Sequence, residues 1–171
     1  NLLTTYSYSW PGSYELVDVQ ATNIGQDSSS YSGLYHYGYY EDTQIWLRDV
    51  HIDGQGYSDA IEVAPYDSSS YTATFSLDMS EVSLTNIDDN GITLATGRTE
   101  ATVADSTIDG AGGYGLYATD ATVEISGSVI RGSGESGIYL GGSTAAVSDT
   151  TSTESADYGW TCDDVTLDLC E

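Results

Sequence analysis

A small residue followed by an aliphatic or aromatic residue returns at near-regular intervals, and this step limits the possible folds most. The small residue is usually glycine, and the residue after it is usually leucine or isoleucine. The step occurs at Gly33-Leu34-Tyr35, Ala60-Ile61-Glu62, Gly91-Ile92-Thr93, Gly115-Leu116-Tyr117, Gly137-Ile138-Tyr139 and Gly159-Trp160-Thr161. Repeats of roughly 22–30 residues are typical of solenoids, in which each repeat stacks on its neighbours.

Two further apolar positions recur in step with this one. They are Ile24, Ile52, Ile87, Ile108 and Ile130 upstream, and the sequences ATV (101–103), ATV (121–123) and AAV (145–147) downstream. Apolar and polar residues alternate over short runs, and helical periodicity is missing. The sequence therefore predicts an all-β fold of many short strands.

An antiparallel sandwich and a parallel β-helix compete for this pattern. A sandwich expects hairpin dipeptides and strands of varied register, whereas here the same residue types return at the same offset. The repeats differ in length mainly between the isoleucine and the glycine, and a solenoid tolerates such differences at one corner. We predict one parallel β-helix domain of about six turns over residues 1–171, with an N-terminal turn and cap (1–43) and a C-terminal cap (161–171).

Three segments carry a resemblance to a known family: NIDDNGITL (86–94), STIDGAGGYGLYATDATV (106–123) and SGSVIRGSGESGIYL (126–140). They resemble the right-handed parallel β-helix repeats of the pectate-lyase-like group of carbohydrate-binding proteins and sugar hydrolases. The resemblance implies the right-handed fold, and a fold alone does not carry an activity. The pectin hydrolases of that group also use a Gly-His-Gly segment and a basic substrate clamp. This sequence lacks the former and offers only Arg131 for the latter.

Two G-x-G-x-x-G motifs, at 110–115 and 132–137, match the fingerprint of dinucleotide-binding folds. Such folds need this turn once, between a strand and a helix. Here the motif recurs one repeat later and no helix is expected. We interpret its glycines as corner residues, where a positive φ or a tight bend is required.

The charge balance excludes several classes of partner. The chain has 27 Asp and Glu against three Arg and no Lys, which gives a net charge of −24. This charge repels nucleic acids, anionic membranes and polyanionic glycans. Neutral glycans, protein surfaces, divalent cations and further copies of the chain stacked end to end remain as partners. We expect a secreted or cell-surface protein that inserts into no membrane.

The residue after the isoleucine is Asp53, Asp88, Asp109 and then Arg131. Stacked turns lie about 4.8 Å apart, so these residues are predicted to form a column, with Arg131 and Asp109 as an exposed ion pair. If the protein is an enzyme, Asp88, Asp89, Asp109 and Arg131 are its candidate residues, because glycoside hydrolysis uses two neighbouring carboxylates. Asp53, Asp88 and Asp109 are also a candidate calcium site, and a solvated acidic face is the alternative.

Tyrosines and cysteines supply the remaining candidates. Tyr35, Tyr37, Tyr39 and Tyr40 lie close together, and tyrosine rings stack on neutral sugars or on protein surfaces. The alternative is that they cap the N-terminal end of the solenoid. Cys162 and Cys170 are predicted to form a disulfide in an oxidising compartment, with free thiols as the alternative.

These observations favour a non-catalytic β-solenoid that serves as a structural, adhesive or binding module. Its open strand edges would allow assembly into a fibre. The alternative is a glycan-active enzyme that uses the stacked carboxylates. No cofactor is expected beyond the calcium left open above.

Overall fold

The computed structural model describes residues 3–7, 12–22, 32–38, 41–54, 59–64, 73–95 and 98–163. Every regular element within these ranges is a β-strand, as the sequence predicts. The strands are β1 (Leu3–Ser7), β2 (Gly12–Thr22), β3 (Leu34–Gly38), β4 (Thr43–Asp53), β5 (Ile61–Val63), β6 (Phe75–Ser80), β7 (Ser83–Ile87), β8 (Ile92–Ala95), β9 (Thr99–Ala104), β10 (Thr107–Ala111), β11 (Leu116–Thr119), β12 (Thr122–Ser126), β13 (Val129–Arg131), β14 (Ile138–Gly141), β15 (Thr144–Ser148), β16 (Thr151–Thr153) and β17 (Trp160–Asp163).

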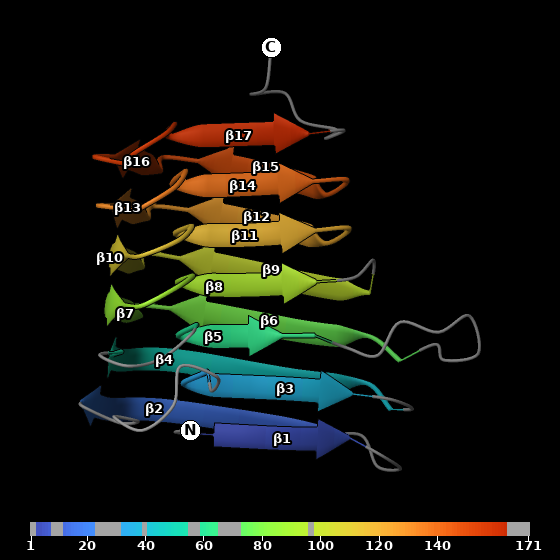
Figure 1. Ribbon diagram of the computed structural model, residues 1–171. Helices are drawn as coiled ribbons and strands as arrows, with labels where there is room; N and C mark the ends of the chain where they lie inside the picture. Colours follow the sequence, from blue (N-terminus) through green and yellow to red (C-terminus); the bar gives the residue numbers. More distant parts are fainter. Residues whose placement is uncertain are drawn as a thin grey trace.

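The strands coil into a solenoid whose described pairings are all parallel (Figure 1). One face is a seven-stranded sheet in the order β1-β3-β5-β8-β11-β14-β17. The other faces belong to a ten-stranded sheet with two arms that meet at β4. The first arm contains β6, β9, β12 and β15, and the second arm contains β7, β10, β13 and β16. Each later coil therefore runs through first arm, second arm and seven-stranded sheet in turn.

The small-aliphatic step forms one continuous column in the seven-stranded sheet. Its aliphatic or aromatic residues are paired in register in the order Leu34, Ile61, Ile92, Leu116, Ile138 and Trp160. The first five are fully buried, and Trp160 on the last coil is 36% exposed. The predicted alignment is confirmed at every step. The column also extends to Leu3 on β1, where the sequence offers no glycine to reveal it.

The other two predicted columns need correction. Leu84, not Ile87, stands between Ile52 and Ile108 in the second arm, while Ile87 pairs with Ala111 three residues further on. Ile130 follows Ile108 as predicted. The alignment of the two ATV segments is wrong by two residues, because Val123 lies beside Ala101 and not beside Val103. A shift of two keeps the inward-facing parity of a strand, which is why both alignments satisfy the hydrophobic pattern. Ile24 lies outside the described residues.

The corner between the two arms is a left-handed turn that is usually occupied by an acidic residue. Its residues have φ between 48° and 56°. They are Asp18, Asp49, Glu81, Asp105, Gly127 and Asp149. Aspartate and glycine enter this conformation more readily than most residues. The acidic excess is thus partly a consequence of turn geometry that recurs on each coil.

The G-x-G-x-x-G motifs stack on each other and serve the coil geometry. Gly110 and Gly132 occupy a further left-handed corner, with φ of 78° and 66°. A Cβ placed on Gly134 would lie 2.0 Å from the carbonyl oxygen of Gly112 on the preceding coil. The interpretation of these glycines as corner residues is confirmed, and no helix follows either motif.

Buried serine hydroxyls directly follow several left-handed residues of the later coils and support those corners. Ser106 Oγ accepts from the backbone N–H of Val82, and Ser128 Oγ accepts from that of Ser106, at 3.1 and 3.2 Å. Ser143 Oγ accepts from Ala121 N–H in the same way at the next corner. These bonds satisfy buried backbone donors that the strand ladders do not reach.

Candidate functional site

The predicted acidic column exists without Asp88. In register, the second arm places Asp53, Thr85, Asp109 and Arg131 one above the other. Arg131 Nη2 lies 2.6 Å from Asp109 Oδ2, and both side chains are exposed, which confirms the expected ion pair. The hydrogen bond to Asp109, and then the charge of that carboxylate, raise the pKa of Arg131.

Asp88 and Asp89 lie in the turn between β7 and β8, one segment beyond this column. Asp89 accepts a backbone bond from Gly113 N–H there, which places it in a different stack from Asp109. Within the described ranges, no group of three or more His, Cys, Asp or Glu side chains is placed to hold a metal ion. The set Asp53, Asp88 and Asp109 is therefore not brought together, because Thr85 takes the place predicted for Asp88.

A carboxyl group that the sequence did not single out is buried beside the start of β5. Asp59 is 6% exposed, and its Oδ1 accepts from the backbone N–H of Asn90 at 3.0 Å. Burial raises its pKa to about 6, hydrogen bonds from Thr93 and Asn90 oppose this, and the charges of Glu62 and Asp89 add to it. Its sequence signal is weak, since an aspartate before a small-aliphatic step resembles any turn aspartate.

Asp59 starts a polar stack that climbs the corner before the seven-stranded sheet. Asn90, one coil later, accepts from Tyr114 N–H through its side-chain oxygen at 2.8 Å and donates to Thr93 Oγ1 at 3.1 Å. The Tyr114 hydroxyl in turn donates to Glu135, and this bond raises the Tyr114 pKa to about 12. The stack links successive coils and ties this corner to the sheet.

Of the four tyrosines predicted to bind ligand, Tyr35 and Tyr37 lie on β3, and Tyr39 and Tyr40 lie outside the described residues. The rings of Tyr35 and Tyr37 are stacked, with centroids 6.3 Å apart and planes inclined by 10°. His36, between them in sequence, points inward and stacks on Phe75 at 4.5 Å. Burial lowers the His36 pKa to about 4, so this imidazole is a neutral core side chain.

A second tyrosine cluster, which the sequence analysis missed, covers the later coils of the seven-stranded sheet. Tyr117 and Tyr139 are paired in register, and their rings stack at 5.0 Å with planes inclined by 10°. Tyr114 leans against both, at 5.3 Å from each. Tyr117 and Tyr139 cover each other's faces, so the cluster stabilises neighbouring coils more readily than it offers a platform for a sugar ring.

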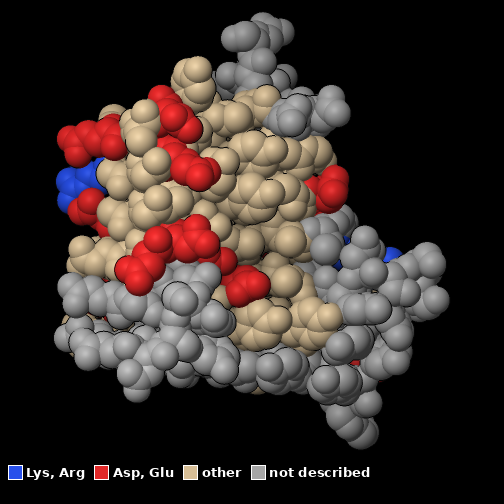
Figure 2. Space-filling view, in the orientation of Figure 1, with Lys and Arg blue, Asp and Glu red and all other residues tan. Residues whose placement is uncertain are grey.

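The outer faces differ in charge. In the seven-stranded sheet, the described outward side chains of β8, β11 and β14 are uncharged, and carboxylates gather at the edges of this face (Figure 2). In the first arm, Asp78, Glu100 and Glu124 point outward from consecutive coils. The first arm therefore presents carboxylates on consecutive coils, which these three strands of the seven-stranded sheet do not.

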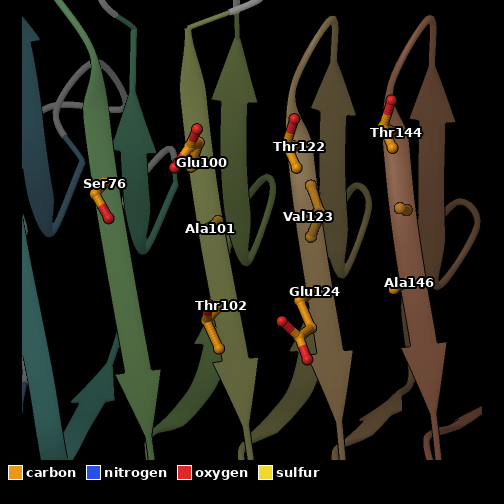
Figure 3. A pocket seen from close by; sticks show the side chains of 10 residues that line it. Ser76, Glu100, Ala101, Thr102, Thr122, Val123, Glu124, Thr144 and Ala146 are labelled. Atoms are coloured by element: carbon orange, nitrogen blue, oxygen red, sulfur yellow. The ribbon is translucent and has the colours of Figure 1, made fainter.

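A groove of about 300 Å³ crosses the outer face of the first arm over β6, β9, β12 and β15. Its hydroxyl and carboxylate side chains point out from four neighbouring strands (Figure 3). They are Ser76, Glu100, Thr102, Thr122, Glu124 and Thr144. A second cavity of about 360 Å³ shares Ser76 and Glu100 and continues the groove toward Asp42 and Gln44. The polar surface thus follows the solenoid axis over several coils.

Strand register places the groove side chains in two rows. Ser76, Glu100, Thr122 and Thr144 form one row, and Thr102 and Glu124 belong to the row two residues further along each strand. Residues 100, 122 and 144 are spaced by one 22-residue coil, and the corner bonds follow the same spacing. This spacing was the sequence signal for the groove, but the misaligned ATV segments concealed it.

The predicted disulfide falls partly outside the described residues. Cys162 lies on β17 in register with Leu140 and is not a free thiol. Cys170 lies outside the described ranges, so its pairing with Cys162 stays a prediction.

Comparison with known proteins supports the architecture. Residues 90–168 match a family model described as the right handed beta helix region. No significant match was found among curated proteins or among solved structures. The parallel register and this match define the class of the protein, a right-handed parallel β-helix.

The described part of the chain contains no helix with the length and apolar character of a membrane span.

Proposed function

We propose that the protein is a non-catalytic β-solenoid module that binds glycan chains in the groove of the first arm. The observation that carries this proposal is the row of hydroxyl and carboxylate side chains on successive coils, set in a cavity of about 300 Å³. Ligand sites are usually concave, and cavities of roughly this size are at the small end of their range.

The side chains of the groove suit a hydroxyl-rich polymer. Carboxylates accept hydrogen bonds from sugar hydroxyls, and threonine hydroxyls both donate and accept them. Because equivalent side chains return about every 4.8 Å, successive units of a linear polymer would meet similar partners on successive coils. The proposed ligand therefore lies along the solenoid axis.

Binding without catalysis is favoured because the carboxyl group whose pKa is raised does not line the groove. Glycosidases use a carboxylic acid of raised pKa that faces the substrate, with a second carboxylate nearby. Among the described residues, the carboxyl with a raised pKa is Asp59, which is 6% exposed and does not line the groove. Asp88, Asp89, Asp109 and Arg131 also lie outside the groove lining.

An extracellular location fits this proposal. Most glycan polymers are met at cell surfaces or in the surrounding medium, and the strongly acidic composition keeps an exposed protein soluble. A disulfide between Cys162 and Cys170 would agree with the same compartment.

Calorimetric titration of the purified chain with neutral oligosaccharides tests the proposal. Thr122→Val removes one hydroxyl from the groove and is expected to weaken binding about 5- to 10-fold, as the loss of one hydrogen bond of about 1–1.4 kcal/mol implies. The matched control is Thr119→Val on β11, which changes the seven-stranded sheet and should leave the affinity unchanged. Absence of binding to neutral and amino-sugar oligosaccharides alike, or equal effects of the two variants, would contradict the proposal.

A further inference from the structure

We infer that the groove of the first arm takes an amino-sugar chain, whose protonated amines lie against Glu100 and Glu124. This inference rests on the proposed glycan binding and specifies the class of glycan. It follows from the charge of the groove, the placement of its two glutamates and the pairing of the strands beneath it.

Among the described residues, the lining of the groove and its continuation carries negative charge and no cation. Their charged lining residues are Asp42, Glu100 and Glu124. Arg98 precedes β9 but does not belong to either lining. Ammonium groups pair with carboxylates in charge-assisted hydrogen bonds, which are stronger than those of neutral hydroxyls. The net charge of −24 also concentrates cations near the surface.

The two glutamates are placed for separate amines. Glu100 is in register with Thr122, and Glu124 is in register with Thr102. The glutamates are thus one coil apart and two residues out of register, which sets their Cα atoms about 8 Å apart. Each carboxylate also has a threonine hydroxyl beside it on the neighbouring coil. An amine and an adjacent hydroxyl of one sugar unit would therefore find matching partners.

A basic peptide fits the same charge less well. Extended peptides gain much of their affinity by adding a strand to an open sheet edge. The backbones of β9 and β12 are already paired with strands on both sides, so the floor of the groove offers no such edge. A peptide would have only side-chain contacts, whereas a sugar chain presents amines and hydroxyls on every unit.

Titration with three β-1,4-linked tetramers tests the inference: glucosamine, N-acetylglucosamine and glucose. At low salt and at a pH where the amines are protonated, the glucosamine tetramer should bind at least 10-fold more tightly than the other two. This advantage should shrink in about 1 M salt, where the Debye length falls to about 3 Å.

Glu100→Gln and Glu124→Gln should each remove most of the preference for the amine while leaving affinity for the neutral tetramers within about 2-fold. Glu154→Gln is the matched control, because it makes the same charge change at an exposed corner outside the groove. It should preserve the preference. Melting curves of all three variants should overlay that of the parent, since each substitution is on an exposed side chain.

The outcomes separate the two proposals. Equal affinity for the three tetramers would overturn the amino-sugar inference and leave glycan binding intact. No binding to any tetramer would overturn both. Equal losses in Glu154→Gln and Glu124→Gln would show general charge attraction and overturn the inference. Tighter binding of an oligolysine, lost in Glu124→Gln, would replace the sugar with a basic peptide.

Discussion

From β4 to β6 the chain takes 32 residues to return to an equivalent position one coil later, whereas from β9 onward it takes 22. We call the coils up to β8 the earlier half and those from β9 onward the later half. Both halves keep one parallel register, and they differ in what fills the interior. The earlier half packs large side chains, including Phe75 with the buried His36. The later half keeps buried aliphatic residues such as Ile125 and Leu140, and adds alanines and buried serines such as Ser128.

This difference shows that a solenoid sets its strand register and its coil length in different places. The strands set the register, and corners absorb changes in length, so the earlier coils are longer without disturbing the ladder. A short coil leaves little room at its corners, and there backbone approach and serine hydroxyls replace bulky side chains. The two halves should therefore respond differently to the same kinds of substitution.

The largest difference is expected for added volume at a corner. Gly134→Ala in the later half puts a Cβ 2.0 Å from a backbone oxygen and should lower the free energy of unfolding by about 3 kcal/mol or more. Gly12→Ala in the earlier half meets the ring of Tyr14, which is able to turn away, and should cost less than about 1 kcal/mol. Urea unfolding of both variants measures this, and equal losses would contradict the comparison.

The next effect is a pH dependence below neutral pH that arises from His36 in the earlier half. The pKa of His36 is about 4 when folded, below its ordinary value, so between pH 4 and about 6.5 the unfolded chain binds more protons. The His36 contribution to the free energy of unfolding should therefore fall as pH is lowered through this window. Its slope is at most about 1.4 kcal/mol per pH unit.

Asp59 acts in the opposite direction and partly hides this slope. Its pKa is about 6 when folded, above its ordinary value, so its contribution falls as pH rises from about 4 to 6. In His36→Phe, the free energy of unfolding should keep only the pH dependence that Asp59 causes. In Asp59→Asn, it should keep only the pH dependence that His36 causes, and the chain should be more stable at neutral pH. Unfolding measured at several pH values separates them, and identical slopes in both variants would refute the assignment.

The smallest effect concerns Ser128, one of the buried serines at the corners of the later half. Ser128→Ala removes the acceptor of the Ser106 N–H and a donor to the Ser126 carbonyl, and should cost about 1–2 kcal/mol. Ser126→Ala changes an outward side chain two residues away and should stay within about 0.5 kcal/mol of the parent. If the two variants unfold at the same urea concentration, the buried hydroxyls do not stabilise the short coils.

The sequence predicted the fold well because one signal was repeated. Each small-aliphatic step lies at the same corner, and its small residue is needed where neighbouring backbones approach closely, so the column from Leu34 to Trp160 is visible without a structure. The isoleucine column failed at Ile87, because Leu84 on the same strand, β7, is equally apolar and takes the position in register. The resulting shift of three residues removed Asp88 from the predicted site.

The candidate site was harder to predict than the fold. The groove depends on which outward side chains stand side by side, and a register error of two residues changes that neighbourhood while leaving the hydrophobic pattern intact. Glu100 and Thr122 become neighbours only once Ala101 is aligned with Val123. The burial of Asp59 depends on its tertiary surroundings, to which local sequence gives no access.

The constant 22-residue register of the later coils makes the protein divisible into interchangeable units. Removing residues 116–137 would join Gly115 to Ile138 and bring equivalent residues of more distant coils into contact, with the core column unbroken. The same cut would shorten the groove by one unit, together with Thr122 and Glu124. The length of polymer that such a protein accommodates is therefore a quantity that insertion or loss of whole coils can adjust in discrete increments.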